Sequence, residues 1–441
     1  MKVHLLQAKR DLPCRTNKDT NGSYGTANDF GDSVTSRILA KIKSRAMNFP
    51  ELAPAYAASI LRGQGHSVTY SDNETNPDAD ITLLQSSMVH FSEEKKWALR
   101  AKQENPKMRV GFFSGVCDTL GAELLECGDF VIAGEFEQAL ADGDIGAFEG
   151  IVDGKRIGNL NEIPMPSWKH IKSSIPYNLI TKRKNTRLSP MITTRGCPMS
   201  CRFYCTYPLV QGVKHRERDV ENVMEEISLL NREYGINLIL FRDPIFTLDM
   251  KRAKAFCQAL IESDLDVNYI IETHVKYVDE ELIDLLAKSG CSAIKFGIEG
   301  GNQEVMKQSK RASNRFEEQE KTLRQCEEKG IKVLAFFILA YFHDTVETVR
   351  ETIDYAIRLN PYGAQFTVAT PYPGTPWYEQ LRSENEKYQL SENYDDYTQY
   401  QLVYNHPHLT YSDVHRLKNE AYRRFYFRPS YIARHHSPGG S

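Results

Sequence analysis

The sequence lacks any apolar run that approaches the ~20 residues needed to cross a membrane. Its first residues carry one early lysine but no sustained apolar stretch and no cleavage site, so we expect no secretory signal. It also lacks an excess of either charge, since 55 basic and 58 acidic residues leave a net charge of −3. The one basic cluster, Lys182-Arg183-Lys184, is predicted to be a solvated loop. We therefore expect no membrane or nucleic-acid partner, and instead a small-molecule substrate.

Paired cysteines, the sign of disulfide bonds, are lacking as well. The nine cysteines are odd in number, and only Cys197, Cys201 and Cys205 lie close together. This distribution is typical of a protein of the reducing cytoplasm whose clustered thiols bind metal. We expect four of the others to be core residues: Cys117, Cys257, Cys291 and Cys326.

The 441 residues are enough for two or three domains. Short apolar strands alternate with helical patterns over residues 1–140, which predicts an open, mostly parallel, Rossmann-like sheet covered by helices. The expected strands are 3–6, 67–70, 81–84, 110–113 and 129–133, and the expected helices are 50–61 and 93–103. Residues 141–187 are rich in Gly, Asp and Pro and are predicted to be a linker.

Residues 188–385 alternate in the same way. Six strands are expected, at 191–194, 238–242, 269–273, 293–298, 333–339 and 364–367. A closed barrel of eight units takes ~250 residues, so this shorter span predicts a partial barrel of six. One of its helices is expected to begin at a capping box of Asp344 and Glu347. Residues 386–441 are predicted to form a small helical extension, with its helix near 412–425 and a disordered end at 437–441.

The run Cys197-Pro-Met-Ser-Cys201-Arg-Phe-Tyr-Cys205 predicts an iron–sulfur site. Three thiolates can hold three corners of a [4Fe–4S] cluster and leave the fourth iron open for another ligand. The run follows the first barrel strand, which places it at the carboxyl mouth of the strands. A structural zinc site is the alternative, but it needs four ligands, and His215 is ten residues away. Inert buried cysteines would not need this spacing.

These residues resemble the radical S-adenosylmethionine (SAM) superfamily. The resemblance is carried by Thr194-Arg195-Gly196-Cys197-Pro198, by Tyr204 before the third cysteine, and by the runs 241–247, 271–273, 296–301 and 370–376. Residues 48–66 and 134–137 are similar to the first helix and the last loop of the cobalamin-binding-type domain that one branch of this superfamily carries. The resemblance covers roughly residues 1–385.

The resemblance implies a role for each matching residue. Cys197, Cys201 and Cys205 would bind the cluster, and SAM would chelate its open iron and be cleaved to a 5′-deoxyadenosyl radical. Tyr204, Thr370 and Tyr372 would border the adenine, while Glu272 and Glu299 would contact the ribose and amino groups of SAM. Those two carboxylates have an alternative role as partners of Lys276 or Lys295. Tyr207 is a candidate proton donor; Asp243, His274 and Lys276 are candidates for substrate binding or proton transfer, or for loop ion pairs.

Two departures from the branch point away from cobalamin. The cysteines are spaced by three and three residues instead of three and two, which resembles the radical SAM diol dehydratases of apramycin (aminoglycoside) biosynthesis. Ser114-Gly115 stands where paired glycines are usual, and Phe136 stands where the last loop usually has glycine. Glycine lets the backbone approach a cofactor closely, whereas a Phe would tend to fill the groove. The resemblance therefore implies a degenerate domain without cobalamin.

The leading hypothesis is hydrogen abstraction from a sugar-like or aminocyclitol-like substrate, followed by loss of a neighbouring hydroxyl as water. A one-electron donor such as flavodoxin or ferredoxin would be needed, and an NAD(P)H-dependent reductase could act on the product. The alternative is a cobalamin-dependent C-methyltransferase with the same fold. A nucleic-acid methylthiotransferase is more distant, because no basic surface or RNA-binding module is evident. A non-catalytic binding module is disfavoured by the intact cysteine run.

Overall fold

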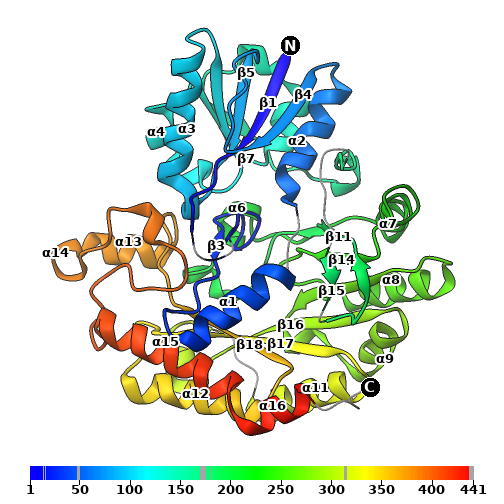
Figure 1. The fold of residues 1–441 in the computed structure, drawn as a ribbon, viewed down its shortest axis with the longest axis vertical. Coiled ribbons are helices and arrows are strands. Elements are labelled where there is room, and N and C mark those ends of the chain that lie inside the picture. The colour runs from blue at the N-terminus through cyan, green and yellow to red at the C-terminus, as the bar shows by residue number, and fades with distance from the viewer. Residues whose placement is uncertain are drawn as a thin grey trace.

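The computed structural model describes residues 1–12, 14, 16–46, 50–168, 175–178, 180–311 and 315–436. Two six-stranded parallel sheets dominate it, one in the upper and one in the lower half of Figure 1. This confirms the expected α/β class, with a Rossmann-like sheet followed by a partial barrel and a C-terminal helical extension. The expected disordered end at 437–441, and the first residues of the stretch 48–66, lie outside the described residues.

The N-terminal sheet has the order β4-β1-β5-β6-β7-β8. Its strands are β4 (Ser67–Asp72), β1 (Lys2–Gln7), β5 (Ile81–Gln85), β6 (Arg109–Phe113), β7 (Phe130–Gly134) and β8 (Gly150–Gly154). Its helices are α2 (Leu52–Gly63), α3 (Phe91–Glu104), α4 (Cys117–Leu125) and α5 (Phe136–Asp142). All of β5 is buried, as is usual for a parallel strand covered on both faces. Strand β8 lies inside the stretch expected to be a linker, so the sheet continues past residue 140.

The chain leaves this sheet after β1 and returns to it only at α2. In between it forms a small hairpin, β2 (Thr16–Asn17) and β3 (Thr26–Ala27), and then α1 (Val34–Ala46). Helix α1 lies beside α15 (Tyr411–Tyr426), far from the N-terminal sheet (Figure 1). Ser36 Oγ donates to Asn419 Oδ1 at 3.2 Å, which joins these two ends of the chain. We call residues 8–51 the N-terminal excursion; no element was predicted between residues 7 and 49.

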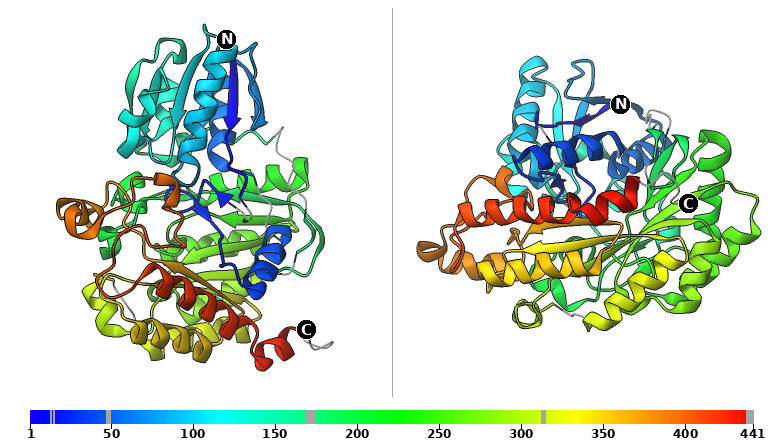
Figure 2. Two further views of the ribbon diagram at one scale, coloured as in Figure 1. Left: turned by 60° about the vertical axis from the view of Figure 1, so that its left-hand side comes forward. Right: turned by 60° about the horizontal axis from the view of Figure 1, so that its bottom comes forward.

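The second sheet has the order β11-β14-β15-β16-β17-β18. Its strands are β11 (Leu188–Met191), β14 (Leu238–Phe241), β15 (Asn268–Thr273), β16 (Cys291–Glu299), β17 (Lys332–Leu339) and β18 (Gly363–Val368). The intervening helices are α6 (Tyr207–Gln211), α7 (Val220–Tyr234), α8 (Met250–Glu262), α9 (Glu280–Lys288), α10 (Gln303–Gln308), α11 (Phe316–Glu328) and α12 (Val346–Leu359). Within the described residues the outer strands β11 and β18 do not pair with each other, so the barrel is open, and Figure 2 shows the sheet from two further sides.

The first barrel strand ends earlier than the sequence predicted. Strand β11 stops at Met191, and β12 (Thr194–Arg195) pairs antiparallel with β13 (Arg216–Glu217). The cause is Asp243, whose Oδ1 accepts hydrogen bonds from the backbone N–H groups of Thr193 and Thr194. These bonds satisfy the amides of the chain as it leaves the sheet.

The predicted capping box of α12 is also displaced by one residue. The N-cap is Thr345, which exchanges side-chain and backbone hydrogen bonds with Thr348. Asp344 instead accepts from Tyr341 N at 2.8 Å and from Thr348 Oγ1 at 2.6 Å, and Glu347 lies in the first turn. A threonine satisfies the geometry of a capping box as well as an acidic residue does.

The C-terminal extension wraps the last barrel strands. It contains α13 (Pro376–Ser383), α14 (Asn385–Tyr388), α15 and α16 (Pro429–His436). Tyr422 Oη donates to Phe366 O at 3.0 Å, so α15, the helix expected near 412–425, is fixed on β18. In the described part of the chain, no helix combines the length and apolar character that a membrane span requires.

Candidate active site

A cavity of about 470 Å³ lies at the carboxyl ends of the barrel strands, beneath the N-terminal excursion. Four parts of the chain line it: the cysteine loop, the ends of the barrel strands with the segments that follow them, several residues between Lys9 and Asn28 together with Glu51, and Gln399 of the C-terminal extension. The cavity is therefore shared between the first 51 residues and the barrel. Of the twelve residues predicted for the site, ten line this cavity: Cys197, Cys201, Tyr204, Cys205, Tyr207, Glu272, His274, Glu299, Thr370 and Tyr372.

The three cysteines lie on the loop between β12 and α6. The loop begins with Gly196, whose φ of +86° suits glycine, and a Cβ there would collide with the backbone of Lys214. Cys197 N donates to Gly212 O at 3.0 Å, and Cys205 N donates to Cys201 O at 3.0 Å. The loop is thus folded back on itself, which brings three thiols that are four residues apart onto one wall.

The environments of the thiols differ. Burial raises the pKa of Cys197 to about 11. A hydrogen bond with Cys205, assisted by the cation of Arg311, lowers the pKa of Cys201 to about 7. Among the described residues, no three Cys, His, Asp or Glu side chains converge on one metal ion. In an iron–sulfur cluster each thiolate binds a separate iron, and the three thiols of one loop can supply three such ligands. The donor set therefore fits three corners of a cluster.

Two carboxylates enter the cavity from neighbouring strands. Glu272, on β15, accepts from Lys295 Nζ at 2.9 Å. Burial opposes its ionisation, but Lys295 and Arg242 together hold its pKa below the usual value. Glu299 ends β16 at a register shift, with φ of +76°, and its Oε1 is 3.0 Å from Arg311 Nη2. Such a conformation in a non-glycine residue is strained and re-aims the side chain, here towards the cavity.

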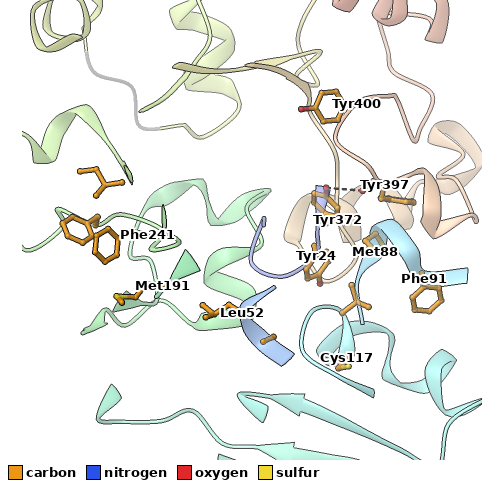
Figure 3. Close-up of a cluster of buried hydrophobic side chains, with 14 of the residues drawn as sticks. Tyr24, Leu52, Met88, Phe91, Cys117, Met191, Phe241, Tyr372, Tyr397 and Tyr400 are labelled. Atoms are coloured by element: carbon orange, nitrogen blue, oxygen red, sulfur yellow. Dashed lines mark hydrogen bonds between the residues drawn. The ribbon is translucent and has the colours of Figure 1, made fainter. Parts of the chain in front are cut away.

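Aromatic and hydroxyl groups line another wall of the cavity. Tyr204 is next to Tyr341, with their hydroxyl oxygens 3.3 Å apart. Thr370 donates to Val368 O at 3.0 Å and Tyr372 to Tyr397 O at 3.3 Å, so both are held by the backbone. Figure 3 shows Tyr372 beside Tyr24 of the excursion, and the two rings meet edge to face at 5.2 Å.

Two of the four predicted catalytic residues line the cavity and two do not. Tyr207 and His274 line the cavity, and burial raises the pKa of the Tyr207 phenol. Asp243 does not line it, because its carboxylate is fully buried against the amides of Thr193 and Thr194. Lys276 does not line it either; its side chain is directed over the ring of Tyr277, at 5.7 Å. The last two therefore lie outside the cavity wall, and the contacts described for them are with Thr193, Thr194 and the ring of Tyr277.

Most of the other residues that line the cavity were not predicted from the sequence. Arg242 and Lys295 sit within or beside recognised runs, but Arg311 follows a helix with no motif. The excursion adds a row of amides and hydroxyls, Thr16, Asn17, Thr20, Asn21, Thr26 and Asn28. Glu51 also lines the cavity; it is 7% exposed, and its Oε2 has no hydrogen-bond partner among the described residues. Only the fold brings these N-terminal residues to the barrel.

The N-terminal sheet has its own crevice, where the strand order reverses between β1 and β5 and where doubly wound sheets bind ligands. Here the excursion occupies it. Lys18 Nζ donates to Gln85 O and to Glu94 Oε1, both at 2.8 Å, and Gln85 Nε2 donates to Asp19 Oδ1 at 3.0 Å. Lys18 and Glu94 are fully buried.

The same loop reaches the barrel on its other side. Met88 N donates to Tyr24 O at 2.8 Å, and Thr206 Oγ1 donates to Asn21 O at 2.7 Å. The space that is left between the sheet and the cysteine loop is a cavity of about 80 Å³, lined in part by Phe136.

The chain is similar in sequence to known proteins. Residues 191–356 match the radical SAM superfamily. An uncharacterized methyltransferase of Pyrococcus horikoshii is 29% identical over 425 residues, which cover 87% of this chain and 89% of that protein. The bacteriochlorophyllide d C-12(1)-methyltransferase of Chlorobaculum tepidum is 24% identical, covering 77% of this chain and 75% of that protein. An anaerobic magnesium-protoporphyrin IX monomethyl ester cyclase of Rubrivivax gelatinosus is 26% identical, and the match covers 77% of this chain and 68% of that protein.

Two solved structures share the whole architecture. The radical SAM methyltransferase TsrM of Kitasatospora setae superposes with a TM-score of 0.64 at 16% identity, over 87% of this chain and 76% of that chain. The cobalamin-dependent SAM radical enzyme OxsB superposes with a TM-score of 0.64 at 14% identity, over 95% of this chain and 66% of that chain. At these identities the likeness concerns the fold: a Rossmann-like domain of the cobalamin-binding type joined to a radical SAM barrel.

Proposed function

Because this chain belongs to the radical SAM superfamily, we propose that it abstracts hydrogen from a polyhydroxylated small molecule, such as a sugar or an aminocyclitol. When bound, the [4Fe–4S] cluster and SAM supply the 5′-deoxyadenosyl radical that takes the hydrogen atom. The observation that carries the proposal is the composition of the cavity, which is lined both by the three thiols and by a set of amides and hydroxyls from the excursion. Amides and hydroxyls pair with the hydroxyls of a sugar without requiring a charge on it.

On the cluster side, the proposal assigns Cys197, Cys201 and Cys205 as ligands. Glu272 and Glu299 are oriented by Lys295 and Arg311, and they are suited to accept hydrogen bonds from the hydroxyl and amino groups of SAM. Tyr204, Thr370 and Tyr372 would border the adenine. These side chains bind, orient and exclude water, while the cofactor supplies the chemistry. A one-electron donor of the flavodoxin or ferredoxin type is part of the proposal.

On the substrate side, the excursion provides the recognition surface. Glu51 is the strongest acceptor there, because a buried carboxylate oxygen without a hydrogen bond gains from a donor on the substrate. Lys9 does not neutralise it fully: Lys9 Nζ is 3.8 Å from Glu51 but 3.1 Å from Asp72. Gln365, Thr367 and Gln399 add amides and a hydroxyl from the barrel and its extension.

We propose that the reaction is dehydration of a diol. A hydrogen atom leaves one hydroxyl-bearing carbon, the adjacent hydroxyl leaves as water after it is protonated, and one electron and one proton complete the carbonyl product. Tyr207 and His274 are the cavity residues that could hold the required proton. Residues of the excursion occupy the crevice of the N-terminal sheet, and this supports a reaction that needs no corrinoid. An NAD(P)H-dependent reductase could then act on the carbonyl.

Cobalamin-dependent C-methylation is the second candidate. It is favoured by the relatives, since the proteins of Pyrococcus horikoshii and Chlorobaculum tepidum are named methyltransferases and both structural neighbours are reported with cobalamin. It requires the excursion to leave the crevice, which would break the Lys18–Glu94 pair and the contacts of Asp19 and Tyr24.

The experiment that tests the proposal is anaerobic purification and reconstitution with iron and sulfide, followed by hydroxocobalamin, desalting, and measurement of iron and cobalt per chain. We expect about four irons and no cobalt. The protein would then be incubated with SAM, a reductant and a panel of sugars and aminocyclitols, and we expect 5′-deoxyadenosine together with a product that has lost water. Stoichiometric cobalt with transfer of a methyl group would overturn dehydration in favour of the second candidate. Absence of iron would refute both.

A further inference from the structure

Two acidic residues that follow β7 lie against the barrel: Glu135, the N-cap of α5, and Glu137, in the first turn of α5. In a doubly wound sheet this carboxyl edge is where ligand-binding loops are found. Here both carboxylates are buried: their side chains are 5% and 3% exposed. Each is committed to an arginine of the second domain, so neither is available to a ligand.

The contacts are direct and form one network. Glu137 Oε1 is 2.5 Å from Arg195 Nη2, and Glu135 binds Arg216 in a bidentate manner, at 2.6 and 2.9 Å. Arg195 is also 3.6 Å from Glu135, which links the two pairs. Glu135 Oε2 further accepts from Ile157 N at 2.7 Å. Bidentate charge-assisted bonds of this kind fix orientation as well as distance.

The arginines sit at the entrance of the cysteine loop. Arg195 and Arg216 are register partners in the β12–β13 ribbon, so two cations face each other across it. Without the two carboxylates these buried charges would repel and the ribbon would open. Only Gly196 separates Arg195 from Cys197, and Gly196 N donates to Gln211 Oε1 at 3.2 Å. Any displacement of Arg195 is therefore transmitted to Cys197.

We infer that Glu135 and Glu137 are positioning residues of the cluster site, through which the N-terminal domain holds the first cluster ligand in place. The domain's last loop thus acts on the barrel chemistry by ion pairs instead of through a bound cofactor. This inference rests on the proposed function, since it assumes that Cys197 binds a cluster. It adds that the site is incomplete without the N-terminal domain.

The test compares Glu137→Gln, which removes the charge, with Glu137→Asp, which keeps the charge but shortens its reach. Glu126→Gln is the matched control, because Glu126 pairs with Lys95 at 2.7 Å on the exposed surface of the same domain. Each reconstituted protein is analysed for iron content, for the electron paramagnetic resonance spectrum of the reduced cluster, and for SAM affinity by equilibrium dialysis. Thermal melting reports whether the fold is retained.

We expect Glu137→Gln to weaken SAM binding by about tenfold or more and to alter the cluster spectrum. Glu137→Asp should lie between this variant and the wild type, and Glu126→Gln should match the wild type. SAM affinity and spectra unchanged in both Glu137 variants would overturn the inference. If Glu137→Gln does not fold, Glu137→Asp decides alone. A wild-type protein that takes up no iron would instead refute the proposed function, so the two failures are distinguishable.

Discussion

At the scale of single residues, the cavity is built from pairs in which one member orients the other. Lys295 orients Glu272, Arg311 orients Glu299, and Cys205 lowers the pKa of Cys201. The thiols and carboxylates could be predicted because the chemistry requires those residue types near recognisable runs. Their partners could not, since a lysine or arginine has no distinguishing pattern in the sequence.

The cysteine loop gives the first prediction. Cys205→Ala should lower the iron content well below that of the wild type and abolish reductive SAM cleavage, because two thiolates cannot hold the cluster that three hold. The measurements are iron per chain and 5′-deoxyadenosine formed under reducing conditions. Cys127→Ala is the control, because Cys127 is a buried residue of the N-terminal domain, only 3% exposed, and does not line the cavity. Equal iron and equal SAM cleavage in the two variants would exclude the cluster assignment.

At the scale of elements, alternation of apolar strands and amphipathic helices predicted eleven strands of the two sheets, with shifts of one to three residues at most ends. The structure adds β8, which lies in a Gly-rich stretch whose pattern, GIVDG, is half exposed and too short to stand out. It also adds the excursion, whose hairpin and helix are stabilised by contacts made far away in the sequence. Short elements of this kind have little local signal.

The excursion gives a second prediction, concerning stability. Lys18→Met should destabilise the protein by about 3–5 kcal/mol, because it leaves the carboxylate of Glu94 buried without its cation. Lys95→Met is the matched control: Lys95 pairs with the exposed Glu126, and its loss should cost less than about 1 kcal/mol.

Urea unfolding followed by circular dichroism compares the two lysine variants. If both substitutions lowered the free energy of unfolding by a similarly small amount, the excursion would not be anchored in the crevice as described. If the wild type retained no hydroxocobalamin after desalting and Lys18→Met did retain it, the difference would be assigned to the filled crevice.

At the scale of the whole molecule, the two sheets are joined by more than a linker. The excursion leaves one sheet after β1, covers the barrel mouth, contacts α15 through α1 and returns to α2. Glu135 and Glu137 bind Arg216 and Arg195 of the β12–β13 ribbon, which adjoins the cysteine loop. We therefore expect calorimetry of the reconstituted protein to give a single unfolding transition. Two well-separated transitions would show that the domains unfold independently, contrary to the shared cavity.

The run Cys197–Cys205, the strand motifs and the Rossmann-like plan could be predicted from the sequence alone, because each depends on residue types at short, regular spacings. The division into domains 1–140, 141–187, 188–385 and 386–441 remains a prediction, although β8 extends the first sheet beyond residue 140 and the excursion, inside the first range, lines the cavity of the barrel. The other side chains that line the cavity with the cysteines depend on the tertiary structure. Asn21 is 185 residues from its partner Thr206, and in the filled crevice Lys18 is 76 residues from Glu94. Contacts between segments so far apart leave no local periodicity that a sequence pattern could report.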